Sequence, residues 1–93
     1  MKTIYKYQLS VTDVQIITMP KNSIILSIGV QDDIPVIWAY IPDSNTKEFV
    51  ERTIKIYGTG NLMDDLFSMA THRFLGTFQL HSVRFVGHIF EKL

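Results

Sequence analysis

Residues 23–41 read SIILSIGVQDDIPVIWAYI, and this stretch decides the fold class. Residues 23–31 alternate with a period of two, which predicts a strand with one buried face. The side chains expected on that face are Ile24, Leu26, Ile28 and Val30. Residues 32–35 form a turn, and residues 36–41 are a nearly continuous apolar run, typical of a strand covered on both faces. Two strands joined by a short turn indicate an antiparallel β protein.

The same pattern continues outward from this hairpin. Strands are expected at residues 3–9, 14–19, 48–57, 73–80 and 83–90, where β-branched and aromatic residues are frequent. His81-Ser82 joins the last two strands in a tight hairpin. Residues 61–69 are the one plausible helix, although an ordered loop fits nine residues nearly as well. We therefore expect a mainly β fold (or α+β with one short helix). It is a single domain over residues 1–93, a small antiparallel barrel or sandwich of about seven strands.

Composition narrows the classes of function. The chain has 93 residues, 46% of them hydrophobic, an ample apolar supply for a small core, so part of it is expected between subunits. The net charge is zero, which argues against binding duplex nucleic acid. With no cysteine, disulfides and thiolate zinc sites are excluded. No apolar run approaches the roughly 20 residues of a membrane span.

Catalytic and metal chemistry are weakly represented. His72, His81 and His88 lie in separate segments without the paired spacing of metal ligands, so no metal site and no cofactor are expected. Ser68 and Ser82 lack the context of an activated nucleophile. The sequence therefore favours a protein that is not an enzyme.

The strand at residues 48–57 ends in Gly58-Thr59-Gly60, where two interpretations stay open. It is either a bulge or turn, or a backbone-lined rim that offers N–H donors to a phosphate or a base edge. It is not a phosphate-binding loop of the GKS type, since no lysine follows.

Arg52 is out of place in the same strand. Alternation puts it on the apolar face with Ile54 and Ile56, where a guanidinium is costly unless it is paired or reaches the rim of the sheet. Either it extends to the rim, or it faces an acidic partner or a ligand phosphate.

Aromatic side chains recur at period two. Trp38 and Tyr40 share one face of their strand, and Tyr5 and Tyr7 share a face of theirs. Such aromatics are usually core, but they also form stacking platforms for nucleobases, and the sequence leaves both roles open.

Several stretches together resemble a group of short phage and prophage proteins. They are the start MKTIYKYQL (residues 1–9), PVIWA (35–39), Arg52-Thr53 leading to IYGTG (56–60), GTFQLH (76–81) and VGHIFE (86–91). The chain is similar to the anti-CBASS 4 proteins, which sequester a cyclic dinucleotide signal of bacterial immunity. The resemblance implies a sponge for a ligand such as 3′,3′-cGAMP that does not cleave it, acting in the cytoplasm of the infected host. It also implies a homo-oligomer, a dimer or tetramer, with pockets near subunit contacts.

The ligand-binding residues are expected from their chemistry: cations for phosphates, aromatic faces for bases, and hydroxyls and amides for base edges. They are Trp38, Arg52, Lys55, Tyr57, Gly58, Thr59, Thr77, Gln79, His81 and Arg84. The alternative function is a protein–protein interaction module that inhibits a host protein through a strand edge.

Overall fold

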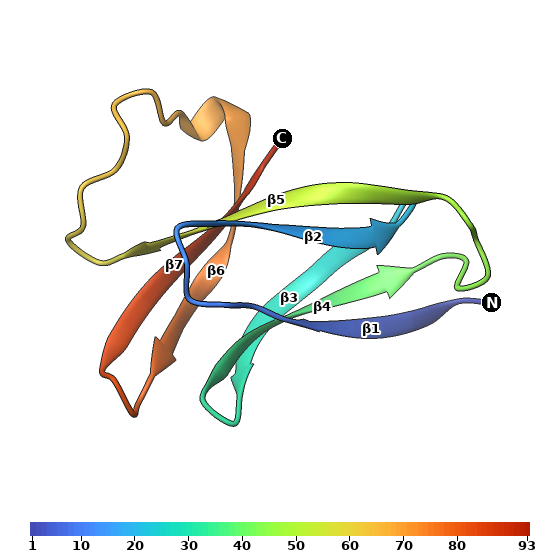
Figure 1. The fold of residues 1–93 in the computed structure, drawn as a ribbon, viewed down its shortest axis with the longest axis horizontal. Helices are drawn as coiled ribbons and strands as arrows, with labels where there is room; N and C mark the ends of the chain where they lie inside the picture. Colours follow the sequence, from blue (N-terminus) through green and yellow to red (C-terminus); the bar gives the residue numbers. More distant parts are fainter.

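Two antiparallel sheets contain most of the chain (Figure 1). The computed structural model describes residues 1–93. The first sheet has the order β1-β4-β3 and the second β2-β5-β7-β6, so seven strands form a mainly β fold, as predicted. The elements are β1 (Thr3–Gln8), β2 (Val14–Pro20), β3 (Ile24–Gln31), β4 (Ile34–Ile41), β5 (Phe49–Gly58), a 3-10 turn (Met69–Thr71), β6 (His72–Leu80) and β7 (Phe85–Lys92). No helix has the length and apolar character that crossing a membrane requires.

The hydrophobic core lies between the inner faces of the two sheets. Its fully buried members come from both sheets, which makes it a single sandwich core. They are Leu9, Met19, Ile37, Ala39, Ile41, Ile54, Ile56, Phe78, Leu80 and Ile89. β3 and β6 meet along one side of the sandwich, where a Cβ on Gly76 would lie 2.6 Å from Ile28 Cγ1. This close approach requires glycine at position 76.

The buried face predicted for residues 23–31 is wrong in its first half. Ile24 and Leu26 are more than half exposed, whereas Ile25 and Ile28 pack against the core. The register shifts between Ile25 and Ser27, which marks a β-bulge. A bulge adds one residue to the strand, so the alternation of faces changes phase at that point.

The possible helix at residues 61–69 is a loop. Asp64 forms a local turn by accepting hydrogen bonds from the Leu66 N–H (2.7 Å, side chain) and the Phe67 N–H (2.9 Å, carbonyl). Leu62 and Leu66 point into solvent, so no apolar stripe holds a helix against the sheet. Instead Phe67 packs against β5 and β7, and only Met69–Thr71 makes a 3-10 turn.

The tight hairpin predicted at His81-Ser82 is longer than expected. β6 ends at Leu80 and β7 begins at Phe85, and Arg84 has a positive φ of 51°. The Asp33 carboxylate, in the turn between β3 and β4, accepts hydrogen bonds from the His81 N–H (2.9 Å) and from the N–H and hydroxyl of Ser82. These bonds, the Ser82 hydroxyl first, lower the pKa of Asp33. The carboxylate thus joins a hairpin of one sheet to a hairpin of the other.

Candidate functional site

Arg52 lies on the inner face of the second sheet, as alternation predicted, and its partner is within the chain. Its guanidinium forms a two-pronged ion pair with Glu91, with Nε on one carboxylate oxygen and Nη2 3.0 Å from the other. Nη1 donates to the Ser23 carbonyl at 3.0 Å. These contacts occupy the guanidinium in the interior, so the structure gives Arg52 a structural role in place of the proposed phosphate contact.

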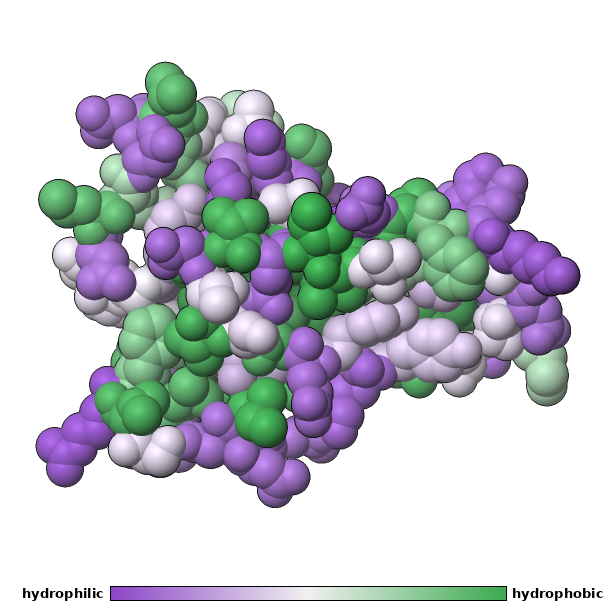
Figure 2. Space-filling model, in the orientation of Figure 1, coloured by the Kyte–Doolittle hydropathy of each residue, from purple (hydrophilic) through white to green (hydrophobic).

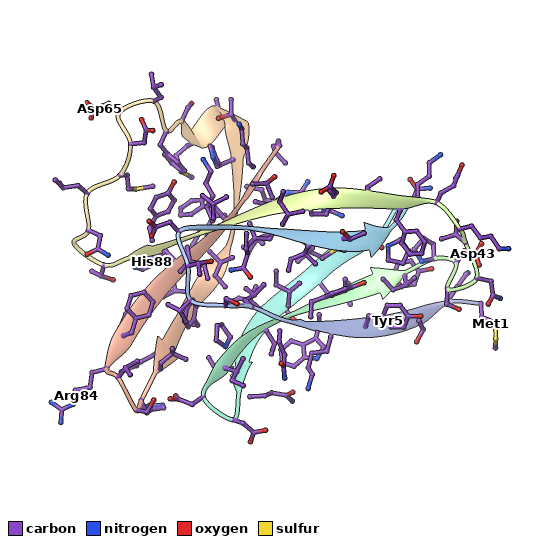
Figure 3. All side chains as sticks on the ribbon, in the orientation of Figure 1. Met1, Tyr5, Asp43, Asp65, Arg84 and His88 are labelled. Carbon is purple, nitrogen blue, oxygen red and sulfur yellow. The ribbon has the colours of Figure 1, made fainter.

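The aromatic residues of the first sheet divide between its two faces. Tyr5 and Tyr7 pair with Ala39 and Ile37 on the inner face, where burial, and secondly Tyr5, raises the pKa of the Tyr7 phenol. Trp38 lies on the outer face across Gly29, since a Cβ there would lie 2.7 Å from the indole ring. Figure 3 shows Tyr5 and Arg84 toward opposite ends of the molecule. Trp38 belongs to β4 of the first sheet, whereas the other proposed ligand contacts belong to the second sheet or to the turns that follow its strands.

The outer face of the second sheet brings several of the predicted residues together. Tyr57 and Thr77 both pair in register with His88, so the three side chains form one row across β5, β7 and β6. Gln79 pairs with Val86 in the next row, and Thr59 follows the end of β5. Sequence reasoning selected Tyr57, Thr59, Thr77 and Gln79 but missed His88 at their centre.

His88 links two threonine hydroxyls. Its Nε2 lies 2.6 Å from Thr59 Oγ1, and its Nδ1 lies 2.9 Å from Thr77 Oγ1. A neutral imidazole has one donor and one acceptor nitrogen, so one hydroxyl accepts from the ring while the other donates to it. When the imidazole changes tautomer, the two threonine hydroxyls exchange their donor and acceptor roles toward the ring. Each threonine can therefore present either a donor or an acceptor to a ligand.

A pocket of about 320 Å³ opens beside this row, and we name it the rim pocket. Its lining residues are Gly58, Thr59, Asn61, Arg84, Phe85 and Val86. Arg84 makes no hydrogen bond or ion pair within the chain, and Figure 3 shows it at the tip of the β6–β7 hairpin, directed away from the body. Its guanidinium is free to meet an anion.

Of the backbone donors expected at Gly58-Thr59-Gly60, the Thr59 N–H is occupied. The Thr59 N–H donates to the Val86 carbonyl at 3.1 Å, and the Asn61 N–H donates to the Gly58 carbonyl at 3.1 Å. Gly60 has a φ of 83°, so this stretch is the turn that closes β5. The donors of the rim pocket include the side chains of Thr59 and Arg84, and not the Thr59 N–H. The same holds at His81, whose N–H is bound to Asp33.

Lys55 lies outside the rim pocket, beneath the loop of residues 61–68. It lines two small cavities together with Asp64, and one of them, about 320 Å³, also contacts Tyr57 and Asp13. Burial raises the pKa of the Tyr57 phenol, and the carboxylates of Asp64 and Asp13 raise it further. These carboxylates make the cavity less favourable for an anion than the rim pocket.

The sequence did not point to His88 as part of the site, because its contacts depend on the register of the strands. His88 alternates outward on β7, but Thr59 directly follows β5 and Thr77 belongs to β6, and only the register of these strands shows that the three converge. Thr59, His88 and Thr77 resemble a nucleophile, base and orienting group in outline. The third member is a hydroxyl, however, which carries no charge to stabilise an imidazolium. The arrangement fits binding better than nucleophilic catalysis.

Comparison with known proteins places the chain in a family. Residues 1–93 match the family described as a domain of unknown function, DUF7352, and the chain belongs to it. No curated protein and no solved structure matches the sequence.

Proposed function

We propose that this protein binds a small phosphorylated nucleotide, such as a cyclic dinucleotide, at the rim pocket and holds it without cleaving it. One observation carries the proposal: Arg84, whose guanidinium has no partner within the chain, lines the same pocket as Thr59, one of the two hydroxyls bound to His88. Arginine suits a phosphate, and the hydroxyls suit the edges of a base or the oxygens of a sugar. The resemblance to the anti-CBASS 4 proteins supports a role as a phage sponge in the cytoplasm of the infected bacterium.

The size of the rim pocket limits what one copy can hold. About 320 Å³ is at the small end of ligand sites, and the pocket is open on one side. It fits one nucleotide half of a cyclic dinucleotide, with one phosphate against Arg84. The second half then contacts another copy of the chain, as expected for a homo-oligomer.

Sequestration needs slow release and no chemistry. Half of the lining residues, Gly58, Phe85 and Val86, lie on β5 and β7, and a rigid β framework limits the entropy lost on binding. His88 is the base that contacts hydroxyls beside the pocket. Both of its ring nitrogens bond to threonine hydroxyls, so no carboxylate supports it as a general base.

Titration calorimetry with 3′,3′-cGAMP tests the site. We expect Arg84→Ala to weaken binding about ten- to hundredfold, because a charge-assisted hydrogen bond contributes about 1.5–3 kcal/mol. Thr59→Val should weaken binding by a smaller factor. Arg73→Ala is the matched control, since Arg73 is an exposed arginine of β6 outside the rim pocket, and it should bind like the wild type. Equal losses in both arginine variants would mean that binding is non-specific.

Recovery of the ligand tests the absence of chemistry. Heating the complex should return intact 3′,3′-cGAMP by mass spectrometry. A linear product that disappears in Thr59→Val would identify Thr59 and His88 as catalytic and overturn the proposal. No binding of any of a panel of cyclic dinucleotides would also overturn it.

A further inference from the structure

The two sheets have four edge strands, and three of them are protected. β1 carries Lys6 in its middle, and a charged side chain on an edge discourages pairing with another chain. β3 and β6 lie against each other along one side of the sandwich, where Gly76 contacts Ile28. The remaining edge is β2, whose seven residues VQIITMP include no charge. β2 is therefore the edge most open to another strand.

The free backbone groups of β2 alternate along the strand. The Asp13 carbonyl accepts from the Ile56 N–H at 3.1 Å, and the Lys21 N–H donates to the Glu48 carbonyl at 3.0 Å, so odd-numbered residues bond to β5. The even-numbered residues Val14, Ile16 and Thr18 thus direct their N–H and C=O groups outward. Pro20 is also even-numbered, a position where its missing N–H breaks no bond to β5.

The side chains beside this edge are apolar. Val14 is 55% exposed and Ile16 is 57% exposed, and both belong to the outer face of the sheet. Figure 2 shows several apolar side chains across the middle of the front face, where β2 runs, with hydrophilic ones between them. Pairing with a further strand would cover part of this surface.

Two opposite charges flank the strand and identify the occupant. Asp13 precedes β2 and Lys21 follows it. In an antiparallel pair of two copies centred on Ile17, Asp13 of each copy lies opposite Lys21 of the other, and the even-numbered residues face each other across the new ladder. A parallel pair would place like charges together. Lys21 now contacts Glu48 at 3.3 Å in an exposed pair, which contributes little and can be shared.

We propose that β2 is a self-pairing edge, through which two copies join about a two-fold axis at Ile17. The two four-stranded sheets then continue as one sheet of eight strands. The outward N–H groups of Ile16 and Thr18 gain partners, whereas the Pro20 carbonyl opposite Val14 already accepts from Ser23. This inference rests on β2 and its flanking charges and does not depend on a ligand in the rim pocket.

Sedimentation equilibrium tests the assembly. The wild-type protein should have twice the chain mass of 10.7 kDa, and Ile16→Lys should have the mass of one chain, because it places a charge beside the ladder. Ile24→Lys is the matched control: it is equally exposed, at 54%, but lies on the other sheet, and this variant should stay dimeric. Circular dichroism of both variants confirms that they are folded.

Charge reversal and hydrogen exchange test the register. Asp13→Lys and Lys21→Asp should each weaken the dimer at least tenfold, and the double variant should recover it. In the wild type, the amides of Ile16 and Thr18 should be protected from exchange, and in Ile16→Lys the amide of Thr18 should lose protection while that of Ile17 keeps it. A monomeric wild type, or a dimer that survives Ile16→Lys or is lost in Ile24→Lys, would overturn the proposal. A stable complex with a host strand in place of the dimer would overturn it too.

Discussion

Replacing Glu91 by glutamine removes the charge that balances Arg52 inside the sandwich. The Glu91 side chain is 5% exposed and the Arg52 side chain 18%, and the guanidinium meets both carboxylate oxygens. In Glu91→Gln, the guanidinium stays in the interior with neutral oxygen acceptors only, the Ser23 carbonyl and the new side-chain amide oxygen at position 91. The perturbation therefore leaves an uncompensated charge and little change in volume.

The expected cost follows from this burial. Breaking a buried ion pair from one side costs about 3–5 kcal/mol, and the partial exposure of Arg52 places the value near the lower end, about 3 kcal/mol. A domain of 93 residues has a free energy of unfolding of roughly 5–14 kcal/mol, so this loss is a large part of it. The melting temperature should fall by about 12–24 °C, since each kcal/mol shifts it by about 4–8 °C in a domain of this size.

Removing both charges should cost less than removing one. An apolar pair in place of a buried ion pair is often neutral or stabilising. In Arg52→Met/Glu91→Leu, however, the Ser23 carbonyl loses the Arg52 donor, which costs about 1–3 kcal/mol. We expect a net loss of about 1–2 kcal/mol for the double variant, well below the sum of the single losses.

Urea unfolding followed by circular dichroism measures these differences. The set comprises the wild type, the single variants Glu91→Gln, Glu91→Leu and Arg52→Met, and the double variant Arg52→Met/Glu91→Leu, whose loss is compared with the sum for Arg52→Met and Glu91→Leu. Glu51→Gln is the control, because Glu51 is exposed on the opposite face of β5 and its loss should change stability by less than about 0.5 kcal/mol. Single variants that lose less than about 1 kcal/mol, or a double variant that loses the sum, would refute the assignment of Arg52 to a structural ion pair.

Two further predictions concern contacts between the sheets. Asp33→Asn should lower the melting temperature at neutral pH. The folded pKa of Asp33 lies below its usual value of 3.8, so its stabilisation is present above pH 3.8 and is lost as the pH falls through the folded pKa. The melting temperatures of the wild type and of Asp33→Asn should therefore converge in strong acid. A difference in melting temperature that stays constant with pH would contradict this. Both Gly76 and Gly60 have a positive φ, of 155° and 83°, so Gly60→Ala, which has open space, should cost about 1–2 kcal/mol; Gly76→Ala should cost about 1–3 kcal/mol more, since its new methyl group also meets Ile28. Differential scanning calorimetry compares the two, and a larger loss at Gly60 would contradict the packing argument.

Alternation along the chain was sufficient to predict the seven strands, because each sheet has one buried face. It failed at Leu26, where a bulge shifts the phase, and nothing in the period of the sequence marks that position. It also failed at residues 81–84, because the longer turn depends on the Asp33 carboxylate, some 48 residues away along the chain. Contacts between distant turns are not contained in a local pattern.

For the candidate site as well, the sequence indicated the residue types but not which of them lie together. The residue types for binding a nucleotide were recognisable, but their grouping depends on register between β5, β6 and β7. Alternation placed Arg52 correctly on the inner face, yet its partner Glu91 is 39 residues away. The same rule places His88 outward, but the convergence of Thr59 and Thr77 on it requires the three-dimensional structure.

The distribution of cations gives the strongest reason to look for a ligand on the outer face of the second sheet. The inner face uses its arginine on Glu91, and Lys21 contacts Glu48 beside the edge. Arg84, by contrast, borders a pocket without a carboxylate, whereas Lys55 shares its cavities with Asp64. The Asp64 carboxylate repels an anion that enters either cavity beneath residues 61–68, whereas no carboxylate lines the rim pocket. Ligand binding that depends on Lys55 and not on Arg84 would therefore place the site beneath the loop and refute the electrostatic basis of the rim pocket.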